Sequence, residues 1–98
     1  MTSNSHPVRL SGDVIFRELD GEAVLLDFAS GRYFGLNAVG TRLWTLLASG
    51  ASVDAAITAI AGEFEATPEE IARDIDELVA ELMSRGLLIP GPAPGSSA

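Results

Sequence analysis

The chain has 98 residues, which suffice for one domain with a modest hydrophobic core but not for two. Its 14 acidic and 6 basic residues give a net charge of -8, so we expect no binding to nucleic acid or to an anionic membrane surface. The absence of cysteine excludes disulfides, thiolate metal sites and thiol catalysis.

The two ends of the chain lack the apolar residues that a core requires. Residues 1–11 are polar and irregular, and residues 90–98 form a tail of Pro, Gly, Ser and Ala. We therefore expect a flexible N-terminus at 1–11, a folded domain at 12–89 and a disordered tail at 90–98. The start shows no signal peptide and no apolar run is long enough to cross a bilayer, which predicts a cytoplasmic location.

The first half of the folded region has the features of three short strands. The turn pair Asp20-Gly21 is a strong hairpin signal and separates apolar segments at 13–19 and 22–28. A second turn, in which Gly31 is suited to a positive φ, leads to a third strand at 32–36. Because loops this short join neighbouring strands, the pattern predicts a three-stranded antiparallel sheet.

From Asn37 onward the apolar residues follow a helical period, and three helices are predicted. Asn37 caps the first helix, Ser52 caps the second, and a capping box at Thr67 begins the third, which ends at Gly86. Residues 87–89 are expected to pack back onto the domain as a candidate extra strand. The prediction is an α+β, winged helix-turn-helix-like fold, with a three-stranded antiparallel sheet followed by three helices.

The chain offers little for catalysis. His6 is the only histidine and lies in the N-terminal segment, so neither a histidine base nor a multi-histidine metal site can be built. The glycines between 31 and 40 match neither a phosphate-binding loop nor a dinucleotide fingerprint. The carboxylates of the third helix have the spacing of a hydrated face. We expect no catalytic residue, no metal and no cofactor, and hence a protein that is not an enzyme.

The helix-turn-helix pattern suggests DNA binding, but the charge of the third helix argues against it. A recognition helix should present Arg and Lys to a groove of the duplex. Residues 67–85 carry only Arg73 and Arg85 against six carboxylates. The sequence therefore predicts a domain with this topology that does not bind DNA.

The third strand, 32–36, remains as a candidate site because an edge strand offers unpaired N–H and C=O groups to another chain. Tyr33 and Phe34 fall on opposite faces of this strand, and Gly35 permits close backbone approach. A peptide added as a strand would gain main-chain hydrogen bonds and side-chain pockets. The alternative is that Tyr33 or Phe34, above all Phe34 together with Leu36, simply points into the core.

Several segments with a characteristic spacing run through the folded region: Val24-Leu-Leu-Asp27, Gly31-Arg-Tyr-Phe-Gly-Leu-Asn37, Gly40, Leu43-Trp44 and Arg85-Gly-Leu-Leu88. In these segments, and over about residues 14–89, the chain resembles the PqqD family, named for pyrroloquinoline quinone biosynthesis protein D. The resemblance implies a winged helix-turn-helix with a leading three-stranded sheet. It also implies a protein that binds the leader segment of a ribosomally made, post-translationally modified peptide and presents it to a modifying enzyme. The leader is expected as an added strand against the third strand, in a cleft closed by the third helix.

Carried onto this chain, the resemblance gives seven candidate peptide-binding residues. Four lie on the strand side of the cleft: Arg32, Tyr33, Phe34 and Gly35. Three lie on the helix side and recur about one turn apart: Asp74, Leu78 and Glu81. For the two acidic residues of the helix, solvated surface charges are the alternative. Four other family residues are assigned to the fold, as a cap, a close-packing site and core: Asn37, Gly40, Leu43 and Trp44.

The resemblance leaves the pathway open. Stand-alone members serve lasso-peptide assembly, where they pass the precursor to a leader peptidase, and others accompany radical-SAM enzymes. The amino-acid sequence of residues 31–37, Gly-Arg-Tyr-Phe-Gly-Leu-Asn, favours the lasso type. An alternative of a different class is a non-catalytic structural or accessory subunit of a larger enzyme complex, and the genes beside this one would separate the two hypotheses.

Overall fold

The computed structural model describes residues 8–90, so the expectations for His6 and for the tail beyond residue 90 lie outside the described residues. Within this range the elements follow as β1 (Val8–Leu10), β2 (Val14–Leu19), β3 (Glu22–Asp27), β4 (Arg32–Leu36), α1 (Ala38–Ala48), α2 (Val53–Glu63), α3 (Pro68–Ser84) and β5 (Leu88–Pro90). Strands β2, β3 and β4 form one antiparallel sheet in that order. The predicted α+β class, a three-stranded antiparallel sheet followed by three helices, is confirmed.

The turns of this sheet follow from their residues. Asp20 and Gly21 both adopt positive φ, 57° and 82°, so that Leu19 pairs directly with Glu22 across the β2–β3 hairpin. Two consecutive positive φ angles define the tight turn whose twist matches that of the flanking strands. Gly31 has a φ of 73°, as its place in the second turn predicted.

Each helix begins at a side chain that accepts a hydrogen bond from the first turn. Asn37 Oδ1 accepts from the Gly40 N–H at 2.9 Å, and Ser52 Oγ accepts from the Ala55 N–H at 3.0 Å. The capping box of α3 is present, with Thr67 at its N-cap. Such caps satisfy N–H groups that have no partner within the helix, and they fix where each helix starts.

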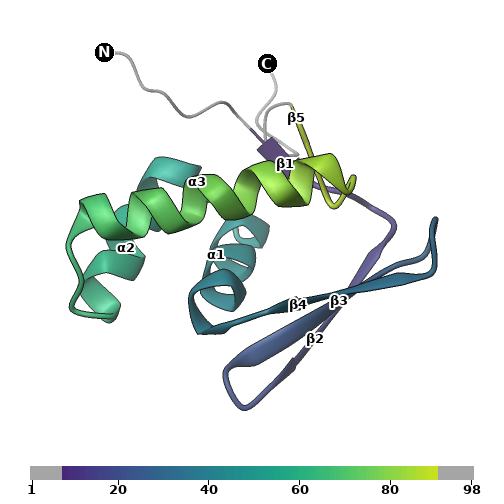
Figure 1. Ribbon diagram of the computed structural model, residues 1–98, viewed down its shortest axis with the longest axis horizontal. Coiled ribbons are helices and arrows are strands. Elements are labelled where there is room, and N and C mark those ends of the chain that lie inside the picture. The colour runs from purple at the N-terminus through teal and green to yellow at the C-terminus, as the bar shows by residue number, and fades with distance from the viewer. Residues whose placement is uncertain (1–7, 91–98) are drawn as a thin grey trace.

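The core lies between the inner face of the sheet and the three helices. In Figure 1, α3 runs across α1 and α2, and the sheet extends to one side below the end of α3. Trp44 is only 4% exposed, in agreement with its assignment to the core. The side chains with almost no exposure are Leu25, Leu43, Ile60, Ile75, Leu82 and Leu88.

Residues 8–10 correct the expected N-terminal boundary. They were expected in an irregular segment that reached residue 11, but they form β1, which pairs antiparallel with β5 from Val8↔Pro90 to Leu10↔Leu88. Pro90, expected in the tail, belongs to β5. A three-residue strand has almost no local signal, because it is stabilised only by a partner from the other end of the domain. The candidate extra strand at 87–89 provides that partner.

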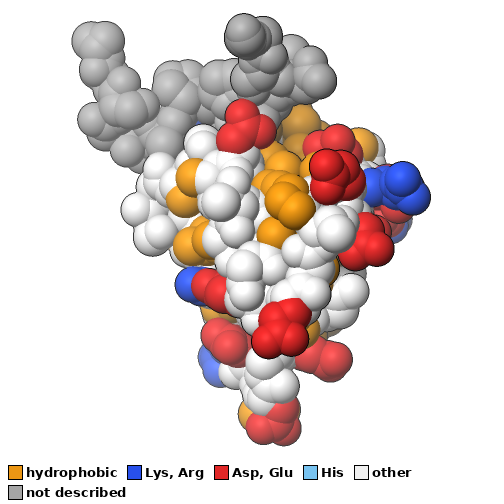
Figure 2. All heavy atoms as spheres, turned by 90° about the vertical axis from the view of Figure 1, so that its left-hand side faces the viewer, with side chains coloured by type: hydrophobic (Ala, Val, Ile, Leu, Met, Phe, Trp, Pro, Cys, Tyr) orange, Lys and Arg blue, Asp and Glu red, His pale blue; other side chains and the backbone are white. Residues whose placement is uncertain are grey.

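The charge of the helical face agrees with the sequence. Figure 2, seen from the α2 side, shows acidic side chains spread around apolar ones, with few basic side chains on that face. A phosphate backbone would be repelled by such a surface. Within residues 8–90, no helix combines the length and the apolar character needed to cross a membrane.

Candidate functional site

β4 is an edge strand: β3 pairs with one of its sides, and no strand of residues 8–90 pairs with the other. The Phe28 N–H donates to the Asp13 carbonyl at 2.9 Å, which fixes the phase of hydrogen bonding between β2 and β3. In antiparallel sheets, hydrogen-bonded and non-bonded pairs alternate, so a central strand bonds its two neighbours through alternate residues. The groups of β3 that face β4 are therefore those of Ala23, Leu25 and Asp27.

This phase identifies the free main-chain groups of β4. Leu25 pairs with Phe34, and Val24 pairs with Gly35. The alternation then directs the N–H and C=O of Phe34 toward β3, and those of its neighbours Tyr33 and Gly35 toward the open side. Two residues of the strand thus present main-chain donors and acceptors to an incoming chain.

Two cavities follow one another along this open side, between β4 and α3; together we call them the β4–α3 cleft. The first, of about 270 Å³, lies at the end of α3 and is also bordered by Asp27 and Ser30 of the β3–β4 turn. Its other lining residues are Arg32, Tyr33, Phe34, Ser84, Arg85 and Leu87. The second, of about 280 Å³, lies nearer the middle of α3 and is lined by Gly35, Leu36, Asn37, Val39, Asp74 and Leu78.

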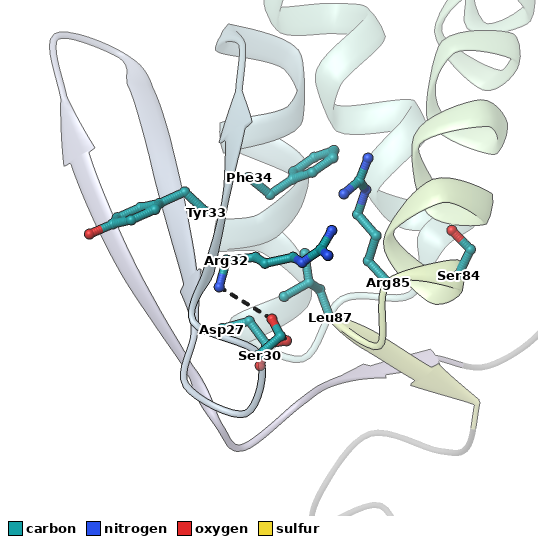
Figure 3. A pocket seen from close by; sticks show the side chains of 8 residues that line it. All are labelled: Asp27, Ser30, Arg32, Tyr33, Phe34, Ser84, Arg85 and Leu87. Carbon is teal, nitrogen blue, oxygen red and sulfur yellow. Dashed lines mark hydrogen bonds between the residues drawn. The ribbon is translucent and has the colours of Figure 1, made fainter.

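The side chains of β4 divide between the two faces of the sheet. Leu36 is 4% exposed and belongs to the core, while Phe34 is partly buried against the core and also lines the first cavity. Tyr33 is 70% exposed, and its ring points away from Phe34 and Arg85 (Figure 3). The expectation of opposite faces is confirmed, and the core alternative holds for Leu36 and in part for Phe34.

Arg85, immediately after α3, connects the helix to the strand. Its guanidinium carbon lies 5.0 Å from the centroid of the Phe34 ring, and its Nη2 lies 3.1 Å from Glu81 Oε2. Glu81 itself lines neither cavity, so its relation to the cleft runs through Arg85. Sequence reasoning did not include Arg85 among the site residues, although it belongs to one of the family segments and is one of two arginines in residues 67–85.

At the second cavity, Leu78 of α3 packs close to α1 at Gly40. A Cβ at this position would lie 3.1 Å from Leu36 Cδ2 and 3.1 Å from Leu78 Cδ2, so any larger residue would require these side chains to shift. The assignment of Gly40 to close packing is confirmed. Gly35 differs, because a Cβ there would meet no atom within 4 Å. The fold therefore does not require a glycine at this position of the open edge.

The cleft carries opposite charges at its two ends. Arg32 and Arg85 line the first cavity, and Asp74 lines the second. The carboxylate of Asp27 accepts hydrogen bonds from the Ala29 N–H and the Ser30 hydroxyl, at 3.1 and 2.9 Å. Within residues 8–90, acidic and histidine side chains form no group of three or more that could hold a metal ion.

The structure thus brings six of the seven predicted residues to the β4–α3 cleft. Three line the first cavity: Arg32, Tyr33 and Phe34. Three line the second: Gly35, Asp74 and Leu78. Glu81 lies outside both, and the lining residues that sequence reasoning missed include Ser84, Leu87 and Val39. These three carry no local signal of a site, since only the packing of α3 beside β4 brings them together.

Comparisons with known proteins identify the class to which this fold and cleft belong. Residues 22–88 match the family model described as coenzyme PQQ synthesis protein D, PqqD. The chain belongs to the PqqD family, as the sequence resemblance indicated.

Two solved structures are similar over nearly their whole length. One, "TbiB1 in Complex with the TbiA(beta) Leader Peptide", is 32% identical, covers 92% of this chain and 99% of its own, and has a TM-score of 0.76. The other, "Lasso peptide synthetase B1 complexed with the leader peptide", is 30% identical, covers 85% of this chain and 98% of its own, and has a TM-score of 0.75. No curated protein sequence matches this chain.

Proposed function

We propose that the protein binds the leader segment of a ribosomally made precursor peptide as a strand added to β4, beside α3. The single observation that carries this proposal is the open edge of β4, where Tyr33 and Gly35 direct N–H and C=O groups away from the sheet. Main-chain pairing supplies affinity in this mode of recognition, and flanking pockets supply specificity. The leader peptides bound in both similar structures support a ligand of this kind.

The cavities give each proposed site residue a role. Phe34 and Leu78, both partly buried, would form the apolar walls against which alternate side chains of the leader pack. Gly35 would contribute its open main-chain N–H and C=O groups to the pairing with the leader. Asp74 would accept a hydrogen bond or a positive charge from the leader, and Glu81 would act by holding Arg85.

The protein would act by presentation, without a catalytic step of its own. In this role it delivers the bound precursor to a leader peptidase or another modifying enzyme. The name of one similar structure, a lasso peptide synthetase component, supports lasso-peptide assembly over a radical-SAM pathway. Because precursor peptides of this class are made on ribosomes, we infer that the protein works in the cytoplasm.

Isothermal titration with a synthetic leader, taken from the precursor gene beside this one, tests the proposal. Gly35→Pro removes an N–H from the open edge and should abolish binding. Gly35→Ala is the matched control: it keeps the N–H, and its Cβ meets no atom within 4 Å, so it should bind within a few fold of the parent.

A second variant tests the helix side of the cleft. Leu78→Glu would place a charge against the apolar wall of the second cavity and should weaken binding, provided that circular dichroism shows an intact fold. Asp74→Ala should have a smaller effect, confined to leaders with a basic residue at the facing position. Binding of the leader by folded Gly35→Pro as tightly as by the parent would rule out strand addition.

A further inference from the structure

Two guanidinium groups face the same space at one end of the β4–α3 cleft. Arg32 comes from β4 and Arg85 from the end of α3, and both side chains project into the first cavity (Figure 3). This cavity lies beside the open edge of β4, along which an added strand would run. A side chain of the bound peptide that points into the cavity would meet both groups.

The carboxylates beside these arginines have other partners, although Asp27 also lines the first cavity. Asp27 is turned to the β3–β4 turn, where the Ala29 N–H and the Ser30 hydroxyl donate to it. Glu81 contacts Arg85 through a single nitrogen, and both side chains of this pair are about half exposed, at 50% and 44%. Among the residues that the structure describes, the Arg32 guanidinium has no hydrogen bond and no ion pair. Both arginines therefore keep donors for a ligand.

We propose that the first cavity selects an acidic side chain of the bound peptide, with Arg32 and Arg85 as the residues that recognise it. This inference rests on the proposed strand addition at β4. A carboxylate matches the planar fork of a guanidinium better than any other side chain does. Because a guanidinium has five N–H donors, Arg85 can remain over Phe34 and still bond a ligand.

The negative charge of Asp74, at the other end of the cleft, also predicts how far apart two recognised residues of the peptide should lie. Asp74 and Arg85 lie about 16 Å apart along α3, from the rise per residue of a helix. An extended chain covers that distance in about five residues. The acidic residue of the peptide should therefore lie about five positions from the residue that faces Asp74, and one register of the peptide is favoured over its neighbours.

Fluorescence anisotropy with the labelled synthetic leader, and with versions in which each Asp or Glu is singly replaced by Asn or Gln, tests this selection. One such replacement should weaken binding about tenfold, as expected for the loss of one charge-assisted pair, and the others should change little. Arg32→Gln and Arg85→Gln should each weaken binding of the parent leader by about the same factor. Neither should weaken binding of the leader that lacks the selected carboxylate.

Arg73→Gln is the matched control, because Arg73 is an exposed arginine of α3 that lines neither cavity. It makes the same change in net charge and should leave the affinity within about twofold. Arg85→Lys keeps the charge but loses the fork, so it should fall between the parent and Arg85→Gln. The amide-substituted leaders test the same pair without any change to the protein, and hence without any effect on its folding.

The results separate the two proposals. Equal binding of all amide-substituted leaders, or equal losses from Arg73→Gln and Arg85→Gln, would overturn the selection of an acidic residue, while loss of binding in folded Gly35→Pro would still uphold strand addition. No binding of the parent leader, or full binding by Gly35→Pro, would overturn the proposed function and this inference with it.

Discussion

The Arg85 guanidinium covers the ring of Phe34, with 5.0 Å between the guanidinium carbon and the ring centroid, and so connects the end of α3 to the edge strand β4. The two residues lie on opposite walls of the first cavity. Glu81, one turn earlier on α3, holds the same guanidinium at 3.1 Å and limits its rotation. The position of α3 relative to the strand edge thus depends partly on this one contact.

A double-mutant cycle should detect the contact. At an exposed site a cation over an aromatic ring contributes about 0.5–1 kcal/mol, so Phe34→Leu and Arg85→Gln should show a coupling of that size in the free energy of unfolding by urea. Tyr33→Leu provides the control, because its ring points away from Arg85 (Figure 3). The effects of Tyr33→Leu and Arg85→Gln should add, and a coupling as large as that of the Phe34 pair would contradict the prediction.

Gly40→Ala should destabilise the protein by about 1–2 kcal/mol, because its methyl group would lie 3.1 Å from both Leu36 and Leu78. The displaced Leu78 should also lower the affinity of the cleft for a leader. Gly62→Ala is the matched substitution in a helix, and its Cβ would meet nothing within 4 Å. It should stabilise the protein by about 0.5–1 kcal/mol through the higher helix propensity of alanine. Denaturant midpoints measured side by side should move in opposite directions; a shared direction would contradict the packing role of Gly40.

Trp44→Ala should cost about 3–5 kcal/mol, because Trp44 is 4% exposed and sits in the main core. For a domain of this size such a loss is comparable to the total free energy of unfolding, so the variant should be largely unfolded. Iodide quenching of tryptophan fluorescence checks the same burial in the parent protein. Efficient quenching in the folded state would show that Trp44 is accessible.

The ion pair between Arg42 and Glu63 should make stability depend on pH. Arg42 Nε and Nη2 donate to the two carboxylate oxygens at 2.7 and 2.8 Å, joining α1 to the end of α2. These hydrogen bonds, opposed by desolvation, lower the pKa of Glu63 from its ordinary value of 4.5. A carboxyl with a lowered folded-state pKa stabilises the protein above its unfolded pKa and loses that contribution as the pH falls through the folded value.

Glu63→Gln should therefore lower the Tm at neutral pH and match the parent once the pH is below the folded-state pKa of Glu63. Arg42→Gln should show the same pH dependence, since it removes the other half of the pair. The double variant should be no less stable than the less stable single variant, within error. Thermal unfolding followed by circular dichroism across this pH range is the measurement, and a Tm difference that persists unchanged at acidic pH would contradict it.

The sequence predicted the elements whose signals are local. Asp20-Gly21, Asn37 and Thr67 act through the bonds and dihedral angles of their immediate neighbours, so each turn or helix start could be assigned before its tertiary partners were known. β1 could not be assigned in this way. Its three residues become a strand only because β5 pairs with them, and that partner is distant in the chain.

The cleft shows the same division between local and tertiary information. The alternation of a strand was enough to separate Tyr33 from Phe34, and the helical period was enough to align Asp74 with Leu78. Arg85 was missed because its place over Phe34 depends on the angle at which α3 crosses the sheet. For Glu81 the helical period was correct, but its carboxylate bonds Arg85 and does not line a cavity.

The pairing of β1 with β5 brings together the two ends of the described residues, Val8–Leu10 and Leu88–Pro90. Loop closure costs most entropy for contacts between distant residues, and such contacts form late in folding. Leu88, which is 1% exposed, is the residue of β5 that belongs to the core and pairs with Leu10 of β1. During synthesis, the hairpins and all three helices can emerge from the ribosome before Leu88, so the apolar surface that Leu88 covers stays exposed until that residue has also been released.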